Sequence, residues 1–351
     1  MDKFFVSVSP HITAKHTTKS IMLEVCIALI PAVIAAIFFF GFYSIFIIAI
    51  SIASTVFGEY IFNVIRKKEH TIKDCSAVVT GLLLGLNLPV TVPFYVPIVG
   101  GLFAILVVKM LFGGIGRNFA NPAITGRIFL VLAWAGVMTK FVPPIDWTKG
   151  FDEGFKFFSC ILNGGGSEIE AVTSATPLGI IKGALSSNVN GLLSGENISL
   201  LDMFLGRTGG TIGETSALAL LIGGLYLGIR KIIDWKIPVV YVATVALFAL
   251  IFGGVEYILP SILGGGLLLG AIFMATDYAT NPNTPIGTII FAFGCGFITV
   301  SIRFFGGYPE GVSFAILLMN VVTPLIDKYI KPPAFGFVKP VKVKKSKEGN
   351  L

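Results

Sequence analysis

The chain is dominated by apolar runs of about twenty residues, and these runs restrict what it can fold into. A bilayer core about 30 Å thick is crossed by roughly 20 mostly apolar residues in a helix. Only 13% of the 351 residues are charged, against about 25% in an ordinary soluble domain. The sequence therefore predicts an all-α polytopic membrane protein with about ten transmembrane helices, at residues 21–40, 42–64, 76–90, 94–112, 122–141, 212–228, 237–254, 259–275, 286–302 and 311–330.

Basic residues stand in short clusters beside these runs and give the chain its net charge of +7. Cytoplasmic loops of membrane proteins carry an excess of Lys and Arg. A path of ten spans puts every cluster and both termini on the cytoplasmic side of the membrane. We therefore expect contact with membrane lipid and no nucleic-acid partner. The clusters are Arg66 to Lys68, Arg117, Arg230 with Lys231 and Lys236, and Lys328 with the tail.

One long polar segment, residues 142–211, separates the apolar runs into two sets of five. It is rich in Gly, Ser and Asn and carries acidic residues, unlike the basic loops. The predicted topology puts it outside the membrane, and loops of this length are usually functional or disordered. The expected organisation is a cytoplasmic N-terminal segment (1–20), a first five-span half (21–141), an extracytoplasmic loop (142–211), a second five-span half (212–330) and a basic cytoplasmic tail (331–351).

Two halves of five spans would have opposite orientations in the membrane, as in transporters built from inverted repeats. The motif Asp74-Cys75-Ser76-Ala77 is echoed by Glu214-Thr215-Ser216-Ala217, and Asn121-Pro122 by Asn281-Pro282. These echoes do not fall at equivalent span numbers. The third run contains Gly81, Gly85 and Pro89 and is predicted to cross only part of the bilayer. An inverted repeat with broken or half helices is therefore a hypothesis.

Several charged residues lie close to membrane depth, where they are costly and tend to line pathways or form pairs. Helix capping is a sufficient explanation for Asp74 and Glu214, and capping of a helix end or snorkelling to the interface is favoured for Glu59 and Lys109. Asp277 follows an apolar run at a point where a helix is expected to end and free its backbone groups. The four cysteines and three histidines show no metal-site spacing, and no metal or catalytic residue is predicted.

The polar loop contains a Thr-Pro pair, Thr176-Pro177, preceded by small residues. Proline disfavours the α region for the residue before it, which predicts an extended Thr176 with its hydroxyl facing outward. Ser174 and Ala175 leave room beside that hydroxyl. On local physics alone, a turn or a helix cap is a sufficient explanation for this threonine.

The run Glu170-Ala171-Val172-Thr173-Ser174-Ala175-Thr176 resembles the flavinylation motif D-x-x-[ST]-G-A-T of the RnfD and NqrB membrane subunits. Glu170 stands at the Asp position and Ser174 at the Gly position. The resemblance covers about residues 20–330, and the short N-terminal segment is more similar to RnfD than to NqrB. Further similar runs are residues 76–82, 121–123, 209–216, 273–277, 306–312 and 314–320.

This resemblance implies FMN attached to Thr176 through a phosphoester, beside Thr173, Ser174 and Ala175, and installed by a flavin transferase. It also implies a second, non-covalent flavin, riboflavin or another, and Asp74, Glu214 and Asp277 are the candidates for a flavin or ion pocket. The implied function is electron relay in an Rnf-type ferredoxin:NAD oxidoreductase coupled to Na⁺ or H⁺ transport, in a bacterial or archaeal inner membrane. The implied partners are RnfA, RnfB, RnfC, RnfE and RnfG. No complete active site is expected on this chain. The alternatives are an NqrB-type subunit of a Na⁺-pumping NADH:quinone oxidoreductase and a non-redox channel or secondary transporter.

Overall fold

The computed structural model describes residues 17–67, 71–155, 176–186, 199–308 and 310–331, and these residues form helices and connecting segments without a strand. Among them, five helices are long and apolar enough to cross a membrane. This confirms the predicted polytopic α-helical fold. The five are α1 (Thr18–Phe40), α2 (Phe42–Ile65), α13 (Lys236–Gly253), α16 (Pro285–Phe305) and α17 (Val312–Tyr329).

Four shorter apolar helices occupy four more of the predicted runs. The third run stops halfway, as its glycines and proline predicted, because α3 ends at Leu86. The helices in the fifth and sixth runs are shorter than the spans predicted there, 122–141 and 212–228. These helices are α3 (Ser76–Leu86), α4 (Tyr95–Phe103), which continues as the π-helix η2 (Ala104–Met110), α5 (Pro122–Ala133) and α12 (Ala217–Ile229).

The sixth run begins as a non-helical turn, whose first residues pair with the end of α3. The backbone N–H of Ile212 donates to the carbonyl of Leu88 at 2.9 Å, and that of Gly213 donates to the carbonyl of Leu86 at 2.7 Å. Backbone groups in a membrane interior must find partners within the protein. Two non-helical segments, one from each half, therefore satisfy each other at the centre of the bundle.

The eighth run is not one straight span, contrary to the prediction for 259–275. Two helical pieces meet at Gly264–Gly266 with a bend of 61°. Gly265 and Gly266 have φ angles of 67° and 66°, a left-handed conformation that residues with side chains seldom adopt. Three consecutive glycines thus break the helix. The pieces are η5 (Val255–Tyr257) with α14 (Ile258–Leu263), and α15 (Leu267–Leu269) with the π-helix η6 (Gly270–Met274).

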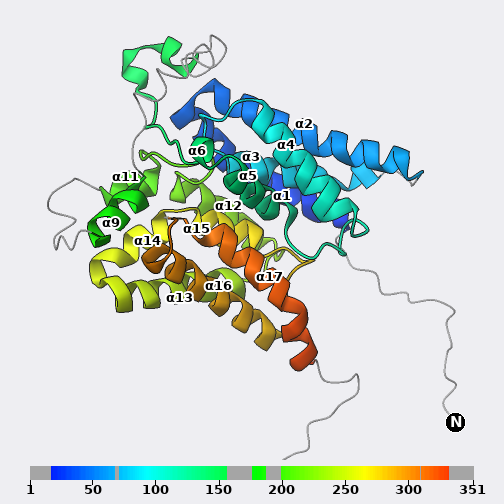
Figure 1. The fold of residues 1–351 in the computed structure, drawn as a ribbon. Helices are drawn as coiled ribbons and strands as arrows, with labels where there is room; N and C mark the ends of the chain where they lie inside the picture. The colour runs from blue at the N-terminus through cyan, green and yellow to red at the C-terminus, as the bar shows by residue number, and fades with distance from the viewer. Residues whose placement is uncertain (1–16, 68–70, 156–175, 187–198, 309, 332–351) are drawn as a thin grey trace, which may run out of the picture.

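The two halves lie side by side, with α1 to α5 in one group and α12 to α17 in the other (Figure 1). Across the boundary, α1 packs against α12 and α5 packs against α17, which are the first and the last spans of the two halves. Packing of equivalent spans against each other is compatible with an inverted repeat, and the repeat itself stays a prediction. One of its sequence echoes is not structural, because Asn121 caps α5 whereas Thr284, not Asn281, caps α16.

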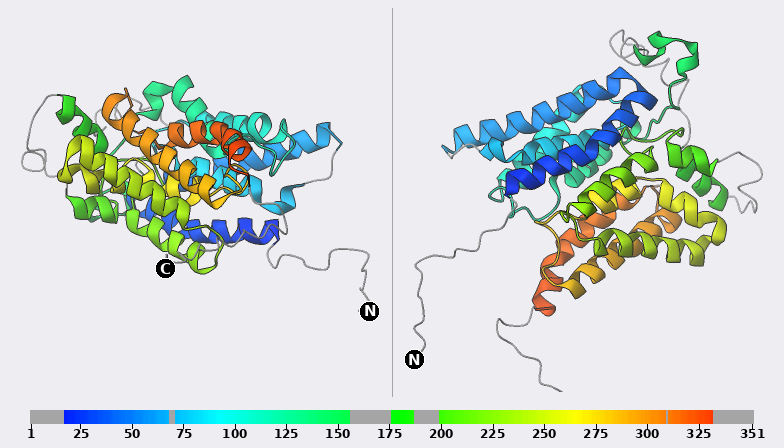
Figure 2. Two further views of the ribbon diagram at one scale, coloured as in Figure 1. Left: turned by 90° about the horizontal axis from the view of Figure 1, so that it is seen from below. Right: turned by 180° about the vertical axis from the view of Figure 1, so that it is seen from behind.

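The helix ends define two opposite faces, which the three views show (Figure 1, Figure 2). We call the face with Arg66, Arg230 and Lys236 the basic face, and the opposite face, with Gly41 and Ile145, the loop face. Short helices cover the loop face, while η1 (Thr71–Asp74) lies on the basic face. Those on the loop face are α6 (Ala135–Met138), η3 (Trp147–Lys149), η4 (Phe151–Phe155), α9 (Pro177–Ser186) and α11 (Leu200–Leu205).

Candidate functional site

Thr176 lies on the loop face, at the start of α9, and lines a small pocket. It is half-buried, and its hydroxyl oxygen accepts a hydrogen bond from the backbone N–H of Gly179 at 3.1 Å. Thr176 is therefore the N-cap of α9, not the outward-facing hydroxyl that the Thr-Pro pair predicted. We call this hollow of about 20 Å³ the loop-face pocket, and it is lined by Thr176, Pro177, Leu178, Met203, Thr208, Gly209, Gly210, Glu214, Thr215, Leu263, Gly264, Gly265 and Glu310.

Lys182 fastens α9 to the rest of the loop face. Its ammonium donates to the carbonyl of Tyr308 at 3.0 Å and also to the carbonyl of Gly306. Partial burial lowers the pKa of Lys182. The helix that begins at Thr176 is thus tied to the connection between α16 and α17.

Beneath the loop-face pocket lies a group of buried charges. Glu214 accepts a hydrogen bond from the Thr211 hydroxyl at 2.9 Å. Arg127, on α5, donates to Asn87 Oδ1 at 3.0 Å and forms an ion pair with Glu310. One oxygen of Glu310 has no partner among the described residues. Charges from both halves therefore meet below Thr176.

Arg303 supports the bend between α14 and α15. This buried guanidinium donates to the carbonyls of Ser261, Gly264 and Gly265 at 2.5, 3.1 and 3.1 Å. The carbonyls at a helix end lack intrahelical partners. A charged donor from α16 therefore supplies the hydrogen bonds that the glycine break removes.

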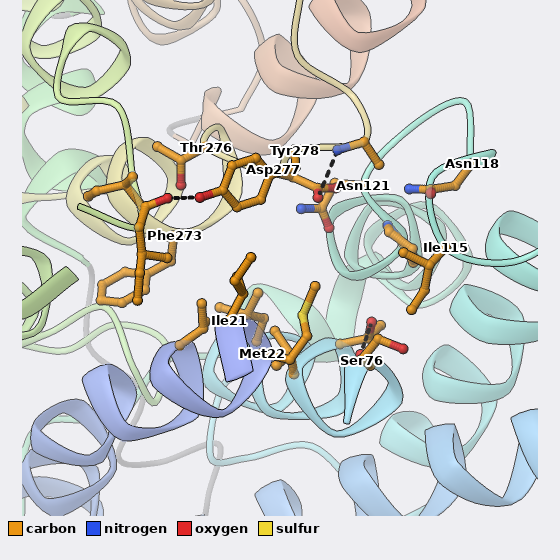
Figure 3. A pocket seen from close by; sticks show the side chains of 18 of the residues that line it. Ile21, Met22, Ser76, Ile115, Asn118, Asn121, Phe273, Thr276, Asp277 and Tyr278 are labelled. Carbon is orange, nitrogen blue, oxygen red and sulfur yellow. Dashed lines mark hydrogen bonds between the residues drawn. The ribbon is translucent and has the colours of Figure 1, made fainter. Parts of the chain in front are cut away.

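A second hollow, the basic-face cavity, opens between the two halves on the opposite side (Figure 3). Its inner part has a volume of about 100 Å³ and is lined by residues of α1, α3, α5, α12 and η6. It adjoins an outer part of about 710 Å³, and six residues line both parts. The shared residues are Ile21, Met22, Ile115, Asp277, Tyr278 and Ala279.

Polar groups gather at one end of this cavity, around Asp277 and Asn121 (Figure 3). The Asp277 carboxylate accepts from the backbone N–H of Ala279 at 3.3 Å. Asn121 caps α5 through Ala123 N–H at 3.0 Å and donates to the carbonyl of Met274 at 3.2 Å. The helix end expected before Asp277 is confirmed, since η6 stops at Met274. The cavity therefore offers both donors and acceptors beside an apolar wall.

Lys109 and Glu59 form a buried ion pair at the other end of the cavity, 2.8 Å apart. Lys109, on the π-helix η2, also donates to the Ser76 hydroxyl at 2.7 Å. Glu59 is 0% exposed and Lys109 is 3% exposed. The expected helix capping or snorkelling of both residues is wrong, because each side chain finds its opposite charge inside the bundle.

The three residues proposed for one flavin or ion pocket do not come together. Glu214 lines the loop-face pocket, Asp277 lines the basic-face cavity, and Asp74 lines neither. Capping explains neither Glu214 nor Asp74. Ser216 caps α12, while Glu214 lies buried in the turn before it, and Cys75 holds the N-cap position of α3. Thr173, Ser174 and Ala175 lie outside the described residues.

Sequence reasoning missed Asn87 and Glu310, which bind the buried Arg127. A signal existed for Asn87, because a lone amide followed by Pro89 inside an apolar run marks a break that needs polar partners. Glu310 lies in a connection between spans and gives no comparable signal. The pairing of Lys109 with Glu59 was also missed, since the two are far apart in sequence.

Comparisons with known proteins agree on one family. The model of the NQR2, RnfD, RnfE family matches residues 5–336. The D-type subunit of the Na⁺-translocating ferredoxin:NAD⁺ oxidoreductase complex of Acetobacterium woodii is 46% identical over 338 residues, covering 95% of this chain and 96% of that protein. Its counterpart in the proton-translocating complex of Clostridium ljungdahlii is 43% identical over 338 residues, with the same coverage. Its counterpart in the ion-translocating oxidoreductase complex of Stutzerimonas stutzeri is 37% identical over 337 residues, covering 92% and 93%.

Proposed function

The chain belongs to the NQR2, RnfD, RnfE family, and from that premise we propose that it is the RnfD membrane subunit of an Rnf-type ferredoxin:NAD⁺ oxidoreductase complex. It is a multi-pass membrane protein. In this function it relays electrons between subunits while the complex moves Na⁺ or H⁺. The relatives from Acetobacterium woodii and Clostridium ljungdahlii belong to complexes that move different ions, so the proposal covers both.

The chain carries FMN on Thr176 in this proposal, and the position of its hydroxyl is the observation that supports it. The oxygen stands at the N-terminus of α9, where the backbone N–H of Gly179 is directed at it. A helix N-terminus favours phosphate, because its free N–H groups and its dipole attract negative charge. A phosphoryl group on this oxygen would keep a hydrogen-bond donor at hand.

The flavin ring itself would lie outside the loop-face pocket. A hollow of about 20 Å³ is close to the volume of one water molecule. A ring attached to Thr176 would therefore extend from the loop face, where a neighbouring subunit can approach it. The flavin transferase needs the same access. The basic face carries the Lys and Arg clusters that are typical of cytoplasmic loops, so we place the loop face outside the cytoplasm and both termini inside it.

The test is covalent flavin on the purified subunit, expressed with its partner subunits and flavin transferase. Wild type should show flavin fluorescence in a denaturing gel, and Thr176→Val should show none. Thr176→Ser keeps an acceptor hydroxyl and is the matched variant. A dark wild-type band, or a fluorescent Thr176→Val band, would overturn the assignment.

The basic-face cavity is our proposed site for the second, non-covalent flavin, riboflavin or another. It joins an apolar wall, which includes Phe273, to the amides of Asn118 and Asn121 and the carboxylate of Asp277. A flavin has an apolar ring system and a polar edge with donors and acceptors, and these residues offer partners for both. The bound flavin supplies one-electron chemistry, while the chain orients it and keeps water out.

The two alternatives differ in what the complex would contain. An NqrB-type subunit would deliver electrons to a quinone, whereas the three relatives described above are all named as D-type subunits of ion-translocating oxidoreductase complexes. A non-redox channel would carry no flavin at all. The partners RnfA, RnfB, RnfC, RnfE and RnfG remain part of the proposal, and co-purification with the tagged chain tests them.

A further inference from the structure

The Lys109–Glu59 pair is the inner part of a longer hydrogen-bonded chain. The Thr71 hydroxyl donates to Glu59 Oε1, and the Asn63 amide donates to Thr71 at 3.1 Å. Lys109 donates to Glu59 Oε2 at 2.8 Å and to Ser76 Oγ at 2.7 Å. Contiguous hydrogen bonds thus run from Thr71 through Glu59 and Lys109 to Ser76.

The two ends of this chain lie in different environments. Thr71, in η1, is exposed on the basic face. Lys109 and Ser76 line the basic-face cavity, and Ser76 appears in its wall in Figure 3. The hydrogen-bonded side chains between these two ends are buried, and Glu59 is fully inaccessible. It therefore connects the basic face to the interior of the bundle.

The Lys109 ammonium also has a third N–H donor, which forms no hydrogen bond with the described residues. An ammonium group carries three N–H donors, and two of those of Lys109 have partners among the described residues. Lys109 stands on a π-helix, a distortion frequently found at functional sites. Ion pairing with Glu59 alone would not require the ammonium to reach the cavity wall.

We propose that Thr71, Glu59 and Lys109 form a proton relay from the basic face to the occupant of the basic-face cavity. This rests on the proposed function, which puts a flavin there and a reduced partner subunit beside it. For each electron that the flavin takes from that partner, Lys109 gives one proton to a ring nitrogen. Water at the basic face returns one proton through Thr71 and Glu59, so the three side chains end unchanged.

A charged redox group in a low-dielectric interior is costly, and an accompanying proton removes that cost. Among the described residues, the charged groups beside this route include Asp74, which acts on Lys109 from η1, its neighbour Lys73 in the same turn, and Asp277 across the cavity. None of these is bonded to Lys109 in the structure. The relay is thus the hydrogen-bonded path, and the two carboxylates contribute only their field.

The experiment uses the whole purified complex with Thr71→Val, which removes the relay hydroxyl from an exposed position. Thr71→Ser keeps the hydroxyl and is the matched control. Flavin reduction and proton uptake are followed by stopped flow, with flavin absorbance and a pH-indicator dye, in H₂O and D₂O. We expect Thr71→Val to slow proton uptake by about tenfold or more and to increase the solvent isotope effect, while Thr71→Ser stays near wild type.

A second variant removes the inner part of the relay without leaving an unpaired charge. The double substitution Lys109→Met with Glu59→Gln is neutral like the pair it replaces, and it should slow uptake at least as strongly. Acid extraction measures non-covalent flavin in every preparation. A complex without extractable flavin overturns the second flavin site and the relay together. A loaded cavity with wild-type uptake in both variants overturns the relay alone.

Discussion

Arg127 on α5 binds Glu310, which lies in the connection between α16 and α17. The same guanidinium donates to Asn87 at 3.0 Å and to Ser313 at 3.1 Å. One side chain of the first half therefore fixes the C-terminus of α3, the connection before α17 and the first turn of α17. It is 5% exposed.

Arg127→Ala is expected to destabilise the protein strongly. Removing one partner of a buried ion pair costs about 3 kcal/mol or more, because the remaining charge stays buried without compensation. The melting temperature of the detergent-solubilised protein should fall by several degrees. Arg207→Ala, at an exposed position on the loop face, is the control and should melt like wild type. Equal melting of the two variants would contradict the role of Arg127.

Replacing Arg303 should loosen the bend between α14 and α15. Arg303→Met leaves three carbonyls at the bend without their donor, and each unsatisfied buried group costs about 1–3 kcal/mol. Hydrogen exchange of residues 258–274 should become faster than in wild type, with Arg303→Lys in between. Unchanged exchange in that segment would show that the glycines hold the bend without Arg303.

Gly265 tests whether crowding at the bend reaches the flavin attachment site. An alanine there would bring its Cβ to 2.2 Å from Leu178 and 2.6 Å from Arg303, whereas at Gly254 it meets nothing within 4 Å. Both glycines have positive φ, so both alanines carry about 1–2 kcal/mol of backbone strain. Only Gly265→Ala should displace α9 and lower covalent flavin loading, read from in-gel fluorescence. Equal loading in both variants would separate the bend from Thr176.

Met22 tests the second flavin site independently of the first. It lines both parts of the basic-face cavity, and Met22→Trp would fill space that the flavin needs. Overpacking costs about 1–3 kcal/mol, so extractable non-covalent flavin should fall by about tenfold, while covalent flavin on Thr176 stays constant. Met22→Leu preserves the volume and should load normally. Loss of both flavins would indicate misfolding instead.

The apolar runs were sufficient to predict a polytopic α-helical fold and the order of its apolar helices, because burial in lipid imposes a strong length and composition signal. The apolar runs were insufficient to predict where a helix is interrupted. Gly81, Gly85 and Pro89 predicted the end of α3, but the run 259–275 was predicted as one span in spite of Gly264–Gly266. The 61° bend at that point places three carbonyls beside Arg303, which comes from a helix much later in the chain.

The candidate site was predictable in part for a related reason. Asp277 could be selected from the local pattern of a helix end, and the cavity confirms that it lines a pocket. Glu59 and Lys109 could not be paired, since their contact depends on how α2 packs against η2. Local rules predict caps and turns, whereas buried charge pairs are decided by tertiary packing.

The broken helix at Gly264–Gly266 also determines how an electric field would fall across this protein. Gly265 lines the loop-face pocket and Phe273 lines the basic-face cavity, and the stretch between them spans about 12 Å at helical rise. A bilayer core is about 30 Å thick. With water in both hollows, most of the membrane voltage drops over this thin barrier. An elementary charge that crosses this barrier would gain or lose nearly the full electrical energy of the membrane potential, about 2.3 kcal/mol per 100 mV. It would do so over less than half the thickness of the bilayer core.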